Sequence, residues 1–188
     1  MIKTEEGRRL SEGEIKILLD NSVILIDTRE KANQHITDYL DKRGIAWESH
    51  KLESGDYSIK TKENINIGLP ELSLENLCAV ERKKTLDELI GNLTHGRERF
   101  FREFERFNGK IVVAVEENEY KDLITQNYRS QMNPVALNNS IMKLSSDYGC
   151  EVVWFNCKRN KEQIAIWVLS WLKSQLKAYL RKFEMLEQ

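Results

Sequence analysis

Charged residues stand directly after an apolar run near the middle of the chain. Leu77 to Val80 is typical of a buried strand, and Glu81, Arg82 and Lys83 follow it. Because successive side chains of a strand point to opposite faces, Glu81 and Lys83 share one face and Arg82 takes the other. With a second carboxylate from Asp56, earlier in the chain, this arrangement could cut phosphodiester bonds.

Asp56 and Glu81 are candidate ligands of a divalent cation. Their oxygens suit a hard ion such as Mg²⁺ or Mn²⁺, which can polarise a phosphate and lower the pKa of a bound water. Lys83 could orient that water or balance charge on the phosphate. Without a metal, repulsion between the two carboxylates should raise the pKa of at least one of them.

Taken alone, a Glu-x-Lys triplet is a weak signal, because the chain is 31% charged and such triplets are common on solvated helix faces. The position of this triplet, at the exit of a buried strand, favours a function. Ligands gather at strand ends in open α/β sheets.

Apolar strands and amphipathic helices alternate along the chain. The expected strands are residues 23–26, 45–50, 57–60, 77–82, 111–115 and 152–155. The expected helices are residues 11–20, 31–43, 85–107, 135–148 and 161–187, with a break or bend in the third at Gly91 or Gly96. Residues 61–73 should form a loop or hairpin, and residues 126–134 a polar loop. This order predicts an α/β fold with a mixed, mainly parallel sheet flanked by helices.

A length of 188 residues suits one domain. We expect an N-terminal helical extension over residues 1–21 and a single domain over residues 22–188 that includes a long C-terminal helix. The first half of that helix must cover the sheet. The part beyond Ser174 could extend past the domain and form a dimer contact.

Composition restricts the location of the protein. Hydrophobic residues make up 40% of the chain, but no apolar run of 18 residues is present, so no membrane span is expected. The N-terminus lacks the apolar segment of a secretory signal. Cys78, Cys150 and Cys157 have no metal-ligand spacing, and Cys78 and Cys150 lie in or beside apolar runs. We therefore expect buried thiols, no zinc site and an intracellular protein, cytoplasmic in a prokaryote or phage and nuclear in a eukaryote.

The charged run resembles the signature of the XPF-type structure-specific nucleases, which is G-D followed by E-R-K-x-x-x-D. The matching residues are Gly55-Asp56, Glu81-Arg82-Lys83 and Asp87. Upstream, Asp27 to Glu30 resembles the D-x-R-E end of the family's first strand, and His95-Gly96-Arg97 resembles its G-R element. The resemblance covers residues 22–156 and implies a restriction-endonuclease-like fold.

The resemblance implies a metal-dependent endonuclease for DNA. Asp56 and Glu81, assisted by Asp27, would hold Mg²⁺ or Mn²⁺, and Lys83 would position the attacking water. Arg82 and Asp87 complete the candidate catalytic set. Asp27 could also act as a turn or cap residue, Arg82 could form a salt bridge within the fold, and Asp87 could cap a helix. The implied substrate is branched DNA such as flaps, forks and junctions, met in repair, recombination or replication.

Candidate DNA contacts cluster after the motif. They are Arg29, Lys84, Arg97, Arg99 and Arg102, with Arg106 completing a stripe at helical spacing that could face phosphates. A solvated helix whose arginines pair with glutamates is the competing interpretation. The four phenylalanines between these arginines could stack on bases, but their helical spacing favours the core. The net charge of −1 does not exclude a local basic patch.

Two alternatives remain open at this stage. One is a non-catalytic DNA-binding or scaffold subunit, against which the presence of Asp27, Asp56, Glu81 and Lys83 argues. The other is a sequence-specific restriction-type enzyme, for which only the loop from Asn64 to Pro70 could read bases. Relatives usually carry a tandem helix-hairpin-helix module after the nuclease domain, and residues 157–188 are too few to hold one. A homodimer or a separate DNA-binding partner could replace that module. The small size suits a phage protein.

Overall fold

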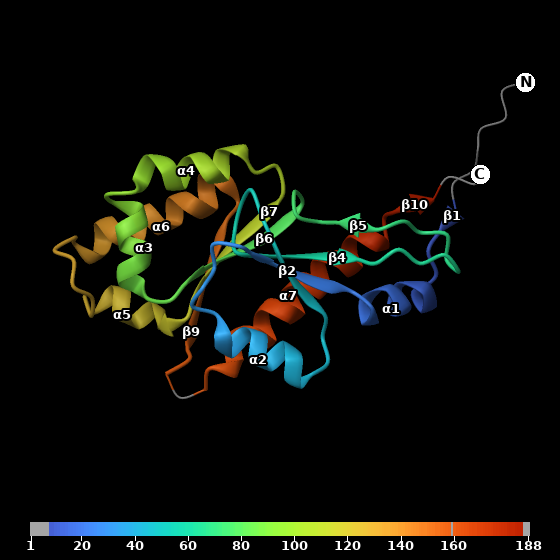
Figure 1. Cartoon of the computed structure of the whole chain (residues 1–188). Helices are drawn as coiled ribbons and strands as arrows, with labels where there is room; N and C mark the ends of the chain where they lie inside the picture. The colour runs from blue at the N-terminus through green and yellow to red at the C-terminus, as the bar shows by residue number, and fades with distance from the viewer. Residues whose placement is uncertain (1–7, 159, 186–188) are drawn as a thin grey trace, which may run out of the picture.

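The computed structural model describes residues 8–158 and 160–185. A mixed sheet of eight strands forms its centre, in the order β3-β2-β4-β6-β7-β9-β8, with β5 paired to β4. The strands of this sheet are β2 (Val23–Asp27), β3 (Trp47–His50), β4 (Tyr57–Thr61), β5 (Leu72–Ser73), β6 (Cys78–Lys83), β7 (Lys110–Val115), β8 (Glu117–Asn118) and β9 (Glu151–Asn156). Short strands β1 (Arg8–Arg9) and β10 (Glu184–Met185) pair separately, near the two ends of the described chain (Figure 1).

Helices cover both faces of the sheet (Figure 1). One face of the sheet packs against α1, α2 and α7, and the other face packs against α3, α4, α5 and α6. Their bounds are α1 (Glu12–Asp20), α2 (Gln34–Lys42), α3 (Leu86–Leu93), α4 (Arg97–Arg106), α5 (Tyr120–Ile124), α6 (Pro134–Tyr148) and α7 (Glu162–Leu180). The predicted α/β architecture, with a flanked mixed sheet and a long C-terminal helix, is confirmed. Within the described residues, no helix is both long and apolar enough to cross a bilayer.

The strand sequences explain this sandwich. All five residues of β2 are buried, as are the last five of β7, as expected for strands covered on both faces. Along β6, Cys78 and Val80 face the α7 layer, whereas Ala79 faces the α3–α4 layer. This alternation continues through the charged residues that follow. Cys78, Cys150 and Cys157 are buried free thiols, as expected for the first two.

The direction of β4 brings the predicted site residues together. β6 runs parallel to β7, and β2 runs parallel to β3. β4, however, lies antiparallel between β2 and β6, so its beginning meets their ends. Asp27 ends β2, Asp56 directly precedes β4, and Glu81 lies near the end of β6. Alternation of strands and helices does not reveal this reversal.

The structure resolves two open expectations and corrects one boundary. The helix expected over residues 85–107 is two helices, separated at Thr94–Gly96 and not at Gly91. Residues 61–73 form a hairpin, in which Asn64 bridges Leu69 and β5 returns along β4. The final helix ends at Leu180 and is followed by β10, and the last two residues of its expected range lie outside the described part.

The second half of α7 belongs to the core. Leu176 and Leu180 are completely buried, in the same cluster as Ile15 and Leu18 of α1. The expectation that the helix leaves the domain beyond Ser174 and forms a dimer contact is therefore wrong for these residues, because α1 covers them. Residues 8–20 of the expected N-terminal extension pack into this core, and its first seven residues lie outside the described chain.

Candidate active site

Asp56 is fixed in the connection that leads into β4. Its backbone N–H donates to Val80 O at 2.8 Å, and its own carbonyl accepts from the N–H of Asp27 at 2.8 Å. Gly55, before it, has a φ of +73°, and a Cβ there would lie 2.8 Å from Ala79 Cβ. Only glycine suits this conformation and this close approach. The backbone therefore holds the Asp56 carboxylate against β6, where Oδ2 accepts from Arg82 N at 2.7 Å.

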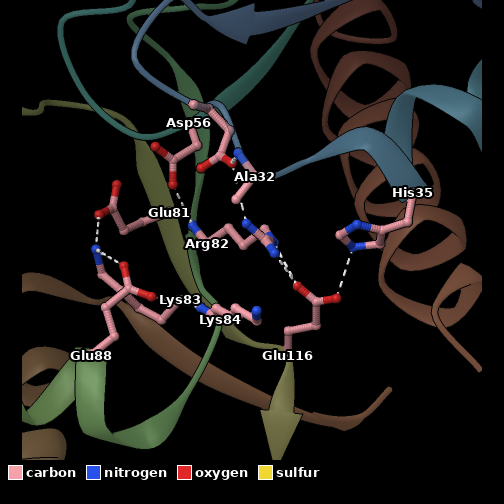
Figure 2. A network of polar contacts seen from close by, with 10 residues as sticks. Ala32, His35, Asp56, Glu81, Arg82, Lys83, Lys84, Glu88 and Glu116 are labelled. Atoms are coloured by element: carbon pink, nitrogen blue, oxygen red, sulfur yellow. Dashed lines mark hydrogen bonds and ion pairs between the residues drawn. The ribbon is translucent and has the colours of Figure 1, made fainter. Parts of the chain in front are cut away.

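Glu81 and Lys83 lie on the face of β6 toward α3 and α4, as the alternation predicts. Lys83 Nζ donates to Glu81 Oε1 at 2.5 Å and lies 3.8 Å from Glu88 Oε1 (Figure 2). Only 11% of the Glu81 side chain and 9% of the Lys83 side chain are exposed. Lys83 Nζ also lies 5.6 Å from the centre of the Phe100 ring. The pair thus occupies a confined site with one carboxylate and one ammonium.

Burial and mutual repulsion perturb both carboxylates. Burial, followed by the charge of Glu81, raises the pKa of Asp56 to about 8. Burial also raises the pKa of Glu81, against the opposing pull of Lys83. Burial alone would lower the pKa of Lys83, but Glu81 and other nearby carboxylates outweigh it and raise that pKa. The metal-free site therefore holds an extra proton at neutral pH, and Lys83 stays charged.

The donor set suits a hard divalent cation. Among the described residues, no group of three or more carboxylate, histidine or cysteine side chains could hold a metal together. Mg²⁺ does not require such a cage, because it commonly binds one or two carboxylates and keeps water or substrate phosphate as its other ligands. Two oxygen donors that repel each other without a cation, Asp56 and Glu81, fit this mode.

Hydrogen bonds within the protein occupy both carboxylate oxygens of Asp27. Its Oδ1 accepts from the backbone N–H of Arg29 at 2.8 Å and from Arg29 Nε at 2.6 Å, and its Oδ2 from Arg29 Nη2 at 3.2 Å and Leu52 N at 2.8 Å. Burial alone would raise the pKa of Asp27, but these hydrogen bonds hold it below its usual value. With both oxygens so occupied, Asp27 is placed to orient Arg29, while its predicted role as a metal ligand stays a prediction.

Arg82 lies across the sheet from the site. Its guanidinium pairs with Glu116, through Nε at 2.7 Å and a second contact, and Nη1 lies 3.2 Å from Glu30 Oε1. His35 Nε2 lies 2.7 Å from the other Glu116 oxygen (Figure 2). Only 4% of the Arg82 and Glu116 side chains are exposed. Arg82 thus forms a salt bridge within the fold, which was one of its two predicted roles. It contacts Asp56 only through its backbone N–H.

Asp87 lies near the N-terminus of α3 and turns toward a different segment. Its Oδ1 accepts from the backbone N–H of Arg129 at 2.8 Å, and its Oδ2 lies 3.8 Å from Arg129 Nε. Thr85, not Asp87, caps α3, by accepting from the N–H of Glu88 at 3.3 Å. The structure therefore places Asp87 in an outer loop contact, and its catalytic role stays untested.

A basic groove lies beside the carboxylates. Its volume is about 740 Å³, and α4 forms one wall. The cationic residues that line it are Arg29, Lys51, Arg99, Arg102 and Arg106. The acidic lining residues are Glu53 and Glu103. Glu103 accepts from the N–H of Gly55 at 3.0 Å, so the groove reaches the loop that holds Asp56.

Some of the residues predicted to contact DNA line this groove, and others do not. Arg29, Arg99 and Arg102 line it, as a phosphate-facing stripe would require. Arg97 instead lies over the Phe101 ring, 4.9 Å from its centre, and borders the neighbouring surface hollows. Lys84 is exposed after β6 and does not line the groove. Phe100, Phe101 and Phe104 are buried, so the core interpretation holds for them.

Two residues of this region were not predicted from the sequence. Lys51 follows β3, and Glu103 lies 48 positions after the glycine it contacts. No periodicity or short motif links positions that far apart. Their roles emerge only when the loop at 51–55 and α4 meet across the groove.

A family model matches most of the chain. The ERCC4 domain model matches residues 26–167, which include all the carboxylates of the site and the whole of α4. The chain belongs to the ERCC4 domain family. The predicted resemblance to XPF-type nucleases is thereby confirmed, and the family is one of structure-specific DNA nucleases. Comparison with curated protein sequences yields no match.

Solved structures agree with this ERCC4 domain in fold. XPF from Aeropyrum pernix superimposes with a TM-score of 0.56 at 19% identity, over 81% of this chain and 64% of the other. XPF from the same organism in complex with DNA gives a TM-score of 0.54 at 18% identity, over 81% of this chain and 65% of the other. The ERCC4 domain described here thus spans just under two thirds of the length of those chains.

Proposed function

We propose that this protein is a metal-dependent endonuclease that hydrolyses phosphodiester bonds in DNA. The observation that carries the proposal is the meeting of Asp56 and Glu81 beside Lys83, next to a groove lined by five cationic side chains. The lining of the groove also includes Glu53 and Glu103, but the cationic side chains are in excess, and a cleft with an excess of one sign of charge attracts the opposite charge. The groove therefore supplies a path for the phosphate backbone, and the carboxylates supply the place for a cation.

Asp56 and Glu81 would hold the cation, Mg²⁺ or Mn²⁺. When bound, such an ion neutralises charge on the phosphate and lowers the pKa of a coordinated water. The two residues can do this only after giving up the proton that the metal-free site retains. Lys83 contacts only Oε1 of Glu81, so Oε2 can take the cation while the ammonium keeps further N–H donors for other groups.

Lys83 acts as a donor and not as a base. Neighbouring carboxylates raise its pKa, so its ammonium keeps its proton at the pH of the cell. A charged ammonium beside Glu81 can orient the attacking water and stabilise the charge that develops on the phosphate. The Phe100 ring next to Nζ limits water on one side, which strengthens these interactions.

Arginines of the groove would hold the DNA backbone. Arg99 and Arg102 project from α4, and Arg29 is oriented by Asp27 at the groove wall. Planar guanidinium groups suit phosphate recognition because they donate two parallel hydrogen bonds. Such contacts fix the position of a duplex or strand without reading its sequence.

We assign branched DNA, with flaps, forks or junctions, as the substrate class, and 5′-phosphate and 3′-hydroxyl ends as the products. Membership in the ERCC4 family and the fold shared with XPF support this assignment. The loop that a restriction-type enzyme would need for base reading, residues 64–70, lies at the opposite end of β4 from Asp56. Its Ile67 and Leu69 are buried in the core, which argues against base reading there.

The first test is cleavage of end-labelled 3′-flap, fork and plain duplex DNA with Mg²⁺ or Mn²⁺. We expect metal-dependent cutting by the native protein and a loss of roughly 100-fold or more in Asp56→Asn and Lys83→Ala. Asp38→Asn is the matched control, because Asp38 is an exposed residue of α2, which packs on the other face of the sheet. Binding of DNA without cutting under any metal would refute the enzyme and favour the scaffold alternative.

A further inference from the structure

Glu103 connects the basic groove to the metal-binding loop. It projects from α4, where Arg99 and Arg102 also lie, and its side chain is half-buried. Its Oε1 accepts from the backbone N–H of Gly55 at 3.0 Å. Gly55 immediately precedes Asp56, so this hydrogen bond joins the helix that would face phosphates to the loop that would face the cation.

The Gly55 loop needs such a partner. At Gly55 the chain takes a left-handed conformation and presses against Ala79 and Val80 of β6. Glycine adopts this conformation without strain but loses more conformational freedom on folding than other residues, so contacts from its surroundings must hold it in place. Gly55 is buried, and an unpaired buried N–H would cost free energy. Glu103 supplies its acceptor from 48 positions away.

The charge of Glu103 also acts on the site. It raises the pKa of Glu81, and it also raises the pKa of Arg29. Its carboxylate therefore lies between the cation ligands and the groove. We do not count it as a cation ligand, because its hydrogen bond within the described residues goes to the Gly55 N–H. Only Oε1 has a hydrogen bond among them, so Oε2 is unoccupied there.

We propose that Glu103 is a positioning residue of the site: by holding Gly55, it fixes the aim of Asp56 and the distance between the cation and the α4 arginines. The inference rests on the proposed function. Residues that orient metal ligands typically change metal affinity or activity by 10- to 100-fold when they are replaced. Glu103 has this relation to Asp56 through one backbone hydrogen bond.

The test compares Glu103→Gln with Glu103→Ala in the metal-free protein and in the protein titrated with Mn²⁺. The glutamine retains an oxygen acceptor for Gly55, whereas the alanine does not. Glu98→Ala is the control, because it removes the same charge from an exposed position of the same helix. Amide hydrogen exchange of Gly55 is followed by NMR, Mn²⁺ affinity by calorimetry, and cleavage by kcat and KM separately.

We expect Glu103→Ala to expose the Gly55 amide to exchange, to weaken Mn²⁺ binding by about tenfold, and to lower kcat more than it raises KM. Glu103→Gln and Glu98→Ala should stay within about threefold of the native protein in all three measurements. Native Gly55 exchange and Mn²⁺ affinity in Glu103→Ala would overturn the proposal. So would equal losses in Glu103→Gln, because charge and not the hydrogen bond would then be the cause.

The exchange and Mn²⁺ measurements separate this inference from the proposed function. A native protein that cuts no DNA but loses Mn²⁺ affinity and Gly55 protection in Glu103→Ala would refute the nuclease and retain the positioning role. If the native protein cuts DNA and Glu103→Ala is unchanged in every measurement, the nuclease is retained and the positioning role is refuted.

Discussion

At the scale of single residues, two carboxylates and one ammonium share a space that solvent hardly reaches. Glu81 and Lys83 are about nine-tenths covered and bonded to each other, and Asp56 faces them from the adjacent strand connection. A site of this kind binds protons when it lacks a cation. Proton release should therefore accompany metal binding.

The first prediction concerns this proton. Because burial and the charge of Glu81 raise the pKa of Asp56 to about 8, a cation must displace a proton at any lower pH. We expect Mn²⁺ affinity to rise from pH 6 to about pH 8 and then to level off. Calorimetry in buffers of different ionisation enthalpy measures both the affinity and the protons released. An Mn²⁺ affinity that stays constant from pH 6 to pH 8 would contradict the raised pKa of Asp56.

The same shift has a consequence for stability. The unfolded chain loses the Asp56 proton near pH 4, whereas the folded chain keeps it to about pH 8. The metal-free protein should therefore lose stability as pH rises between these values. In Asp56→Asn this dependence should be weaker, and the melting temperature at pH 8 should be higher by several degrees. Thermal melts at pH 5 and pH 8 with a chelator measure the difference, and Asp87→Asn serves as the control.

Arg82 provides a residue-scale prediction on the other face. It is buried between Glu116 and Glu30, and removing one member of a buried charge network leaves an unpaired charge. We expect Arg82→Met to lower the free energy of unfolding by about 3–5 kcal/mol. The double variant Arg82→Met with Glu116→Gln should recover part of that loss. Urea denaturation measures both, and no recovery in the double variant would contradict this network.

At the scale of elements, α4 is a wall of the groove as well as a core helix. Phe100, Phe101 and Phe104 anchor it, which leaves Arg99 and Arg102 at the groove. Edge-to-face contacts among the phenylalanines help to fix the rotation of the helix, with the Phe100 and Phe104 ring centres 4.8 Å apart and their planes at 84°. The direction of the arginines therefore follows from packing on the opposite face.

We predict that Arg99→Ala and Arg102→Ala each weaken DNA binding by about tenfold and lower the salt-dependence slope by about one. Arg43→Ala is the control, because Arg43 lies at the end of α2, over Tyr39. Fluorescence anisotropy at several salt concentrations, on an Asp56→Asn background, measures binding without cleavage. Equal behaviour of Arg43→Ala and the two α4 variants would exclude a groove-specific contact.

The elements also show how far sequence reasoning reaches. Alternation along β6 predicted that Glu81 and Lys83 share a face and that Arg82 leaves it, because side-chain direction in a strand is local. The reversal of β4, the contact of Glu103 with Gly55 and the contribution of Lys51 to the groove were not predicted. Each depends on which distant segments pack together, and no short pattern encodes that choice. The prediction that α7 leaves the domain was wrong for the same reason: α1, which covers its end, is far from it in the sequence.

At the scale of the whole molecule, one hydrophobic layer joins both ends of the described chain to the sheet. Ile15 and Leu18 of α1 pack with Leu176 and Leu180 of α7, and β1 pairs with β10 beyond them. The site lies on the other side of the sheet, toward α3 and α4. The core that joins both ends of the described chain is therefore separated from the site by the sheet.

This separation gives the last prediction. Leu180→Ala removes a completely buried side chain, which should lower the free energy of unfolding by about 2–5 kcal/mol. Mn²⁺ affinity, measured well below the melting temperature, should change little. Denaturation at two protein concentrations checks the interpretation, because a dimer contact would make the effect depend on concentration.

The strand β6 carries two different chemistries on its two sides. Glu81 and Lys83 serve the site, and Arg82, between them, serves the buried ion network. Inserting one residue just before Glu81 would send the guanidinium toward the cation position and the carboxylate into the place where Arg82 meets Glu116. Both functions would fail together. Length changes should thus be fatal within this strand, whereas the exposed tip of the hairpin around Ile65 should accept them.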